Sequence, residues 1–179
     1  MRGKKQPKPL TCTKIVLDSG PLLVLLCGSS GTFDDEYTKQ ICSNEKEAEF
    51  YEEHGEQILK IVAKKEVFIT PHVVAEVSNK IKSKNIDVGR ILSENNAVIK
   101  HLLSRGKEQH IELKELLGHR IFKQHMKFGI TDCGLMMISD KTTLLLTHDR
   151  ELRDKAKHEG IDAMLPQEMY YSVAGYKIV

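Results

Sequence analysis

Short apolar runs alternate along this chain with longer segments in which apolar positions recur at helical spacing. The runs at 14–17, 67–69 and 143–146 are rich in Ile, Val and Leu and read as buried strands, and 161–165 reads as a final strand. Buried strands that alternate with helices predict a parallel sheet covered on both faces. We therefore expect an α/β fold.

The segments between these runs carry recognisable helix signals. Pro21 starts a helix through Cys27, and a polar segment at about 45–65 is amphipathic. Thr70 is the expected cap of a helix beginning at Pro71, and Thr131 of a helix through 139. Further helices are expected over 113–122 and from Asp149 to about 158, a loop over 28–31, and no clear pattern over 83–110.

Composition places the chain among ordinary globular proteins. It has 179 residues, 40% hydrophobic and 29% charged, with a net charge of +2, so one domain over 10–170 is expected, with a basic tail at 1–9 and a C-terminal tail at 171–179. No apolar stretch approaches the roughly 20 residues that cross a membrane, and we expect a cytoplasmic protein without a membrane partner. The four cysteines show no metal-binding spacing and are expected to be reduced.

Four acidic residues stand where such a sheet places its ligands. Asp18 and Asp149 follow buried strands, while Glu76 and Asp132 lie in early turns of predicted helices. Ligands of open α/β sheets bind at the carboxyl ends of the strands, so the four carboxylates are expected to converge there. Converged carboxylates repel one another unless a cation neutralises them, and oxygen ligands of this kind suit Mg²⁺ or Mn²⁺.

Each acid also has a structural interpretation. Asp18 and Asp149 could cap the next helix, and Asp132 could favour a helix N-terminus through its charge. Glu76 could form an ion pair with Lys80 one turn later. Thr147 could orient a neighbouring carboxylate, whereas His72, His125 and His148 are interpreted as surface or capping residues, with His148 close enough to Asp149 to touch substrate.

The order of these motifs resembles a known family. The segments L17-D-S-G-P-L-L23, T70-P-H-V-V-A-E76, G129-I-T-D132 and L145-L-T-H-D149 are similar to the successive motifs of PIN-domain nucleases, and the stretch from Glu151 to Pro166 resembles their C-terminal helix and strand. Gly20 departs from many members, which carry asparagine or serine there.

The resemblance implies a three-layer α/β/α sandwich with a central, mainly parallel sheet. It also implies a Mg²⁺- or Mn²⁺-dependent ribonuclease, more often an endonuclease, in which Asp18, Glu76, Asp132 and Asp149 are the metal-binding and catalytic acids. RNA is then the substrate. Many relatives are toxins of toxin–antitoxin pairs, so an antitoxin or other protein inhibitor is an implied partner, and so is a second copy of the chain in a homodimer.

Two other classes of function remain open at this stage. A non-catalytic PIN-like module could bind RNA or protein as a scaffold, but it would usually have lost one of the acids. An aspartyl-phosphate phosphatase also has an aspartate after its first strand, but it needs a second acid two residues later, where Gly20 stands. Basic residues between Lys80 and Lys127 could hold RNA phosphates or form a solvated surface.

Overall fold

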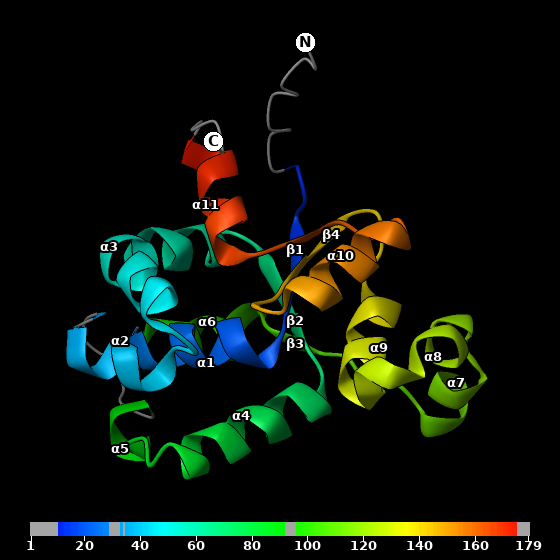
Figure 1. Ribbon diagram of the computed structural model, residues 1–179, viewed down its shortest axis with the longest axis horizontal. Coiled ribbons are helices and arrows are strands. Elements are labelled where there is room, and N and C mark those ends of the chain that lie inside the picture. The colour runs from blue at the N-terminus through cyan, green and yellow to red at the C-terminus, as the bar shows by residue number, and fades with distance from the viewer. Residues whose placement is uncertain (1–10, 29–32, 34, 92–95, 175–179) are drawn as a thin grey trace.

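The computed structural model describes residues 11–28, 33, 35–91 and 96–174 (Figure 1). The tail expected at 1–9 and most of the loop expected at 28–31 lie outside these residues. Within them, five parallel strands form one sheet in the order β3-β2-β1-β4-β5. The strands are β1 (Lys14–Leu17), β2 (Glu66–Ile69), β3 (Lys107–Glu108), β4 (Thr143–Leu146) and β5 (Ala163–Met164).

The central strand of the sheet is β1, and its neighbour β4 is aligned with it so that Ile15 lies opposite Leu144 and Leu17 opposite Leu146. Both strands are buried along nearly their whole length, which is why they read as continuous apolar runs. The strands expected at 14–17 and 143–146 are confirmed. The two-residue exposed strand β3 was not predicted, because Lys107 and Glu108 have no strand-like pattern.

Helices lie on both sides of the sheet, as the α/β/α prediction requires. In Figure 1, α3 and α11 lie together on one side of the strands, and α9 and α10 lie on the other. The helices are α1 (Ser19–Gly28), α2 (Asp35–Ile41), α3 (Glu45–Val62), α4 (Pro71–Ser83), α5 (Val88–Ile91), α6 (Ala97–Arg105), α7 (Leu113–Gly118), α8 (Arg120–His125), a 3₁₀ turn η1 (Met126–Phe128), α9 (Gly129–Ile138), α10 (Arg150–His158) and α11 (Pro166–Ala174).

Local signals explain where several helices start. The hydroxyl of Thr70 accepts a hydrogen bond from the Val73 amide at 3.3 Å, with Pro71 in the first turn, so the predicted start of α4 is confirmed. Val73 and Val77 form its buried stripe. Helix α1 packs beside α4 and is buried on nearly all sides, and it carries the chain away from Asp18.

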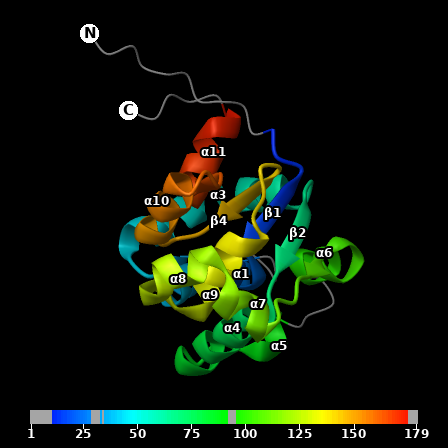
Figure 2. The same ribbon diagram turned by 90° about the vertical axis from the view of Figure 1, so that its right-hand side faces the viewer.

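The expectations for residues 113–139 were partly wrong. The helix expected over 113–122 is two helices divided at His119, whose Nδ1 accepts from the Ile121 amide and so starts α8. Helix α9 begins at Gly129, where φ is +87°, a conformation that glycine adopts without strain. Thr131 therefore lies inside α9 and does not cap it. Figure 2 shows α7, α8 and α9 gathered on one side of the molecule.

His125, interpreted above as a surface or capping residue, is buried, and its Nε2 lies 3.0 Å from Glu159 Oε1.

The four cysteines are free thiols, as expected. Helix α11 continues to Ala174, into the stretch expected as a tail. Among the helices described, none is long and apolar enough to cross a membrane.

Candidate active site

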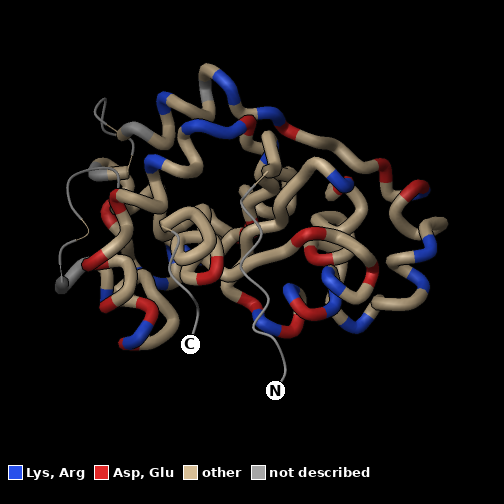
Figure 3. The backbone as a smooth tube through the Cα atoms, turned by 90° about the horizontal axis from the view of Figure 1, so that it is seen from above, with Lys and Arg blue, Asp and Glu red and all other residues tan. Residues whose placement is uncertain are grey.

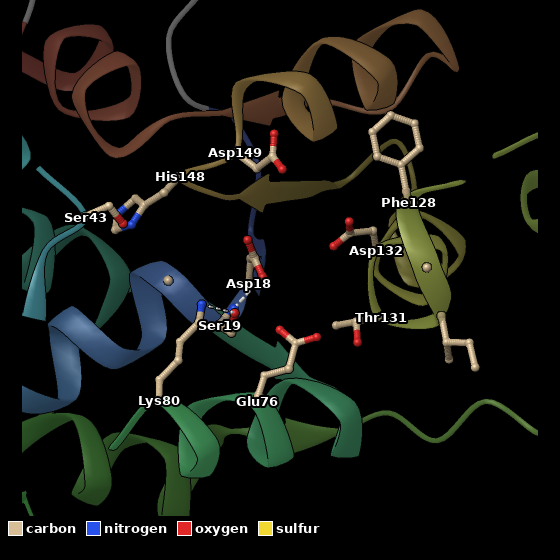
Figure 4. A pocket seen from close by; sticks show the side chains of 13 residues that line it. Asp18, Ser19, Ser43, Glu76, Lys80, Phe128, Thr131, Asp132, His148 and Asp149 are labelled. Atoms are coloured by element: carbon tan, nitrogen blue, oxygen red, sulfur yellow. Dashed lines mark hydrogen bonds between the residues drawn. The ribbon is translucent and has the colours of Figure 1, made fainter. Parts of the chain in front are cut away.

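A pocket of about 570 Å³ contains all four of the acidic residues singled out in the sequence. Figure 4 shows the carboxylates of Asp18, Glu76 and Asp132 facing a common space, with Asp149 beside it. The four side chains come from the end of β1, from α4, from the first turn of α9 and from the end of β4. The expected convergence at the carboxyl ends of the strands is thus what the structure shows. We call this space the acidic pocket.

Asp18 is held in place by its neighbours on the sheet. Its amide donates to the Leu146 carbonyl at 3.0 Å, which continues the pairing of β1 with β4. The Thr147 hydroxyl donates to Asp18 Oδ2 at 2.7 Å, and the Ser19 amide donates to Oδ1 at 2.5 Å. Asp18 is 9% exposed, so this carboxylate is almost buried and fixed from two directions. The prediction that Thr147 orients a neighbouring carboxylate is confirmed.

Asp149 combines a structural contact with a place in the pocket. It is the N-cap of α10, and its Oδ1 accepts from the amides of Glu151 at 2.7 Å and Leu152 at 3.0 Å. Both capping bonds end on Oδ1, so the cap does not use Oδ2. The Asp149 amide donates to the Thr147 hydroxyl oxygen at 2.9 Å. Thr147 therefore links the two aspartates that follow the central strands.

Glu76 projects into the pocket from the second turn of α4. The ion pair considered above between Glu76 and Lys80 does not form between these two described side chains. Lys80 Nζ instead donates to Ser19 Oγ at 2.8 Å, across the space between α4 and α1. Lys80 lines the acidic pocket. A single ammonium group is thus placed among four carboxylates.

The proton affinity of Asp132 is raised in the folded protein. Burial first, and then the charges of Asp18, Asp149 and Glu76, raise its pKa from 3.8 to about 7, while Lys80 acts in the opposite direction. A carboxyl surrounded by like charges keeps its proton to higher pH. The charges of the other three acids therefore act on Asp132, in addition to its burial.

The donor set fits a hard divalent cation in its chemistry. Carboxylate oxygens are the preferred protein ligands of Mg²⁺ and Mn²⁺, and a cation would remove the repulsion that raises the pKa of Asp132. In the rotamers seen among the described residues, no three acidic, histidine or cysteine side chains are close enough together to hold one ion. An ion held directly by three of these side chains would thus require side-chain rotation, whereas one held by one or two carboxylates and water would not.

His148 is a pocket residue whose role the sequence did not reveal. It is not a surface or capping residue: Nδ1 lies 2.7 Å from Glu47 Oε1, and Nε2 lies 2.8 Å from the Tyr51 hydroxyl. Burial acts to raise the pKa of Glu47, but the hydrogen bond and charge of His148, the Ser43 amide and the charge of Lys84 together outweigh burial, and the pKa is lowered. Burial raises the pKa of Tyr51, so its hydroxyl stays protonated. Glu47 and Tyr51 both belong to α3, which lies far from His148 in the sequence, so neither contact could be predicted from the sequence.

Comparison with known proteins assigns the family. Residues 52–166 match the PIN domain, which is more than half of the chain, so the chain belongs to the PIN-domain family. No curated protein and no solved structure matches it. The matched stretch contains Glu76, Asp132 and Asp149, and the acidic pocket adds Asp18 to them. The fold is a nuclease-type fold, of a family whose members are generally nucleases that use divalent metal ions.

Proposed function

We propose that this protein is a Mg²⁺- or Mn²⁺-dependent ribonuclease that hydrolyses phosphodiester bonds within an RNA strand. The observation that carries the proposal is the convergence of four carboxylates, from four separate elements, in one pocket. Unpaired carboxylates at such close quarters destabilise a fold. The carboxylates lower the stability of the fold when no cation is bound. Their convergence is therefore best explained by a cation that binds there during function.

In this proposal, Asp18, Asp132 and Asp149 hold the principal cation. Asp18 is positioned by Thr147, and Asp149 has an oxygen that its helix cap does not use. A bound divalent cation would polarise the phosphate and offset the negative charge that develops on its oxygens. Glu76 completes the site and orients the attacking water, whose proton its carboxylate can accept.

Lys80 supplies the positive charge that the substrate needs. Its ammonium group lies in the acidic pocket and is held by the Ser19 hydroxyl. The water oxygen attacks phosphorus and gives its proton to Glu76, the bond from phosphorus to the leaving oxygen breaks, and that oxygen takes up a proton from solvent water. Lys80 can bind a non-bridging phosphate oxygen during this step, because an ammonium group binds phosphate as a point charge.

The proposal is tested by incubating labelled linear and circular RNA with Mn²⁺, with Mg²⁺ and with EDTA. We expect cleavage with either metal, none with EDTA, and cleavage of the circular RNA because it has no ends for an exonuclease. Asp132→Asn should reduce the rate by at least a hundredfold. Asp154→Asn is the matched control, because Asp154 is exposed on α10 and outside the acidic pocket.

The outcomes separate the two candidate classes of function. Cleavage that survives Asp132→Asn with unchanged metal dependence would sink the assignment of the acids. Absence of cleavage by the wild type, together with absence of Mn²⁺ binding in calorimetry, would favour the non-catalytic scaffold. Cleavage of linear RNA alone would retain the nuclease and make it an exonuclease.

A further inference from the structure

A second pocket adjoins the acidic pocket and has a different chemistry. It has a volume of about 380 Å³, within the roughly 300–1,000 Å³ typical of small-molecule sites. His148 lines both pockets. The two residues that follow His148 line different pockets: Asp149 lines the acidic pocket and Arg150 lines the second one. Consecutive Cα atoms are about 3.8 Å apart, so the two spaces are immediate neighbours.

Two cations and two aromatic rings characterise this second space. Lys46 and Arg150 are exposed, and neither has an ion-pair partner in the described part of the chain. Tyr171 contributes a half-buried ring, Phe50 lines the pocket but is only 8% exposed, and Gln167 contributes an amide that can both donate and accept hydrogen bonds. The one acidic residue, Glu47, is already paired with His148. The pocket therefore offers positive charge and ring faces beside a strongly negative site.

The rings are held by contacts behind the pocket. Phe50 lies edge-on to Tyr51 and Tyr170, with centroid distances of 5.4 and 6.0 Å, and Tyr171 lies edge-on to Tyr170 at 5.3 Å. These contacts join α3 to α11, which explains the aromatic cluster in structural terms. They also present preorganised ring surface to the pocket, at little cost in side-chain entropy on binding.

Charge on the rest of the surface is mixed. Figure 3 shows acidic and basic positions interspersed around the outline of the molecule. An RNA strand that binds in the acidic pocket brings its neighbouring phosphates close to the carboxylates of that pocket, which repel them. Cations placed next to the pocket reduce that repulsion, and rings beside them can stack on bases, as in other single-strand binding sites.

We propose that this second pocket binds one nucleotide of single-stranded RNA adjacent to the phosphodiester in the acidic pocket. Its base stacks on the ring of Tyr171, beside the buried Phe50, and its phosphate contacts Lys46 and Arg150. The proposal rests on the ribonuclease function proposed above, since it assigns the pocket to the same substrate. We call this second pocket the flanking pocket.

Binding can be measured separately from cleavage. A labelled single-stranded RNA and an abasic chain of the same length are titrated into the protein in EDTA and low salt, with fluorescence anisotropy as the readout. We expect the RNA to bind at least fivefold more tightly than the abasic chain. Tyr171→Ala should weaken RNA binding by about fivefold or more, the range of single stacking contacts, and leave the abasic chain unchanged. Tyr171→Phe should retain wild-type binding, because the ring remains.

The contribution of Lys46 and Arg150 to binding is tested by removing both charges, and the control removes two other positive charges. Lys46→Ala/Arg150→Ala should weaken both ligands by about tenfold and lower the slope of log affinity against log salt by roughly 1 to 2. Lys114→Ala/Lys123→Ala removes the same charge from α7 and α8, at the opposite end of the molecule in Figure 1, and should have a much smaller effect. Melting temperatures show whether each variant is folded.

The possible results are all decisive. Equal binding of RNA and abasic chain by the wild type, unchanged RNA binding by folded Tyr171→Ala, or equal losses in the two charge pairs would each overturn the flanking pocket. If the wild type cleaves RNA with Mn²⁺ in that case, the ribonuclease remains and only the flanking pocket fails. If the binding results are as expected but no RNA is cleaved, the flanking pocket stands as an RNA site and the nuclease proposal fails.

Discussion

The imidazole of His148 occupies the space that a side chain at Gly20 would need. A Cβ at Gly20 would lie 2.8 Å from His148 Nδ1 and 3.3 Å from Cγ. The ring cannot move away easily, because Glu47 and Tyr51 hold its two nitrogens. This contact gives a physical reason for glycine at a position where many PIN domains carry asparagine or serine: the larger residues would displace His148.

Replacing Gly20 with alanine should therefore destabilise the protein through His148. Overpacking typically costs about 1–3 kcal/mol, although alanine favours a helix by up to about 1 kcal/mol. We expect Gly20→Ala to lower the free energy of unfolding in urea. In a His148→Ala background the same substitution should be neutral or stabilising, because the opposing ring is gone. Equal destabilisation in both backgrounds would show that His148 is not the obstacle.

Thr147 is expected to influence catalysis although it need not touch the substrate. Its hydroxyl donates to Asp18 and accepts from the Asp149 amide. Thr147→Val keeps the shape but removes both bonds, which leaves a buried carboxylate oxygen without its donor. We expect an activity loss of about 10–100-fold, typical of residues that orient metal ligands, and a stability loss of roughly 1–3 kcal/mol. Thr142→Val, on the exposed turn before β4, is the control for losing a threonine hydroxyl.

Divalent cations should stabilise the folded protein. The unfolded chain has no assembled site, so binding favours the native state by mass action, by about 2.7 kcal/mol at a hundredfold excess over the dissociation constant. We expect the melting temperature to rise with millimolar Mn²⁺ in the wild type. The rise should disappear in Asp18→Asn and persist in the control Asp154→Asn. An equal rise in Asp18→Asn would place the bound ion elsewhere.

The parts of this molecule that depend on local sequence pattern could be predicted from the sequence. The apolar runs of β1 and β4 and the Thr70–Pro71 start of α4 are short-range signals, and the structure has all three. The rule that ligands gather at the carboxyl ends of parallel strands brought Asp18 and Asp149 together without coordinates.

The features that were missed depend on contacts between distant residues. His148 looked like a surface residue because nothing nearby in sequence pairs with it, and its partner Glu47 lies on α3. Thr131 looked like a helix cap, but α9 starts three residues earlier than such a cap would allow, at Gly129 with its positive φ. The flanking pocket is formed by α3, α10 and α11, and α11 was not predicted.

The raised pKa of Asp132 predicts how stability depends on pH when no cation is bound. Its pKa rises from 3.8 in the unfolded chain to about 7 in the folded protein, because of burial and the nearby acids. The folded state then binds this proton more tightly, so the contribution of Asp132 to stability is greatest below pH 3.8 and falls as pH rises towards 7. Asp132→Asn removes this loss and should stabilise the protein in EDTA by about 1–3 kcal/mol at pH 8, less than the full pKa shift implies because Asp132 is partly exposed and solvent screens the repulsion.

The gain should be smaller at pH 5, where Asp132 in the folded protein is still protonated, and should grow up to about pH 7. Urea unfolding of wild type and Asp132→Asn at pH 5, 6, 7 and 8, all in EDTA, measures the difference directly. Asp154→Asn should show no such trend, since Asp154 is exposed and lies outside the acidic pocket. A constant difference across this range would mean that Asp132 does not titrate near neutrality, and that the four carboxylates repel one another less than their positions indicate. With saturating Mn²⁺ the order should reverse, because the cation stabilises the wild type through a carboxylate that Asp132→Asn lacks.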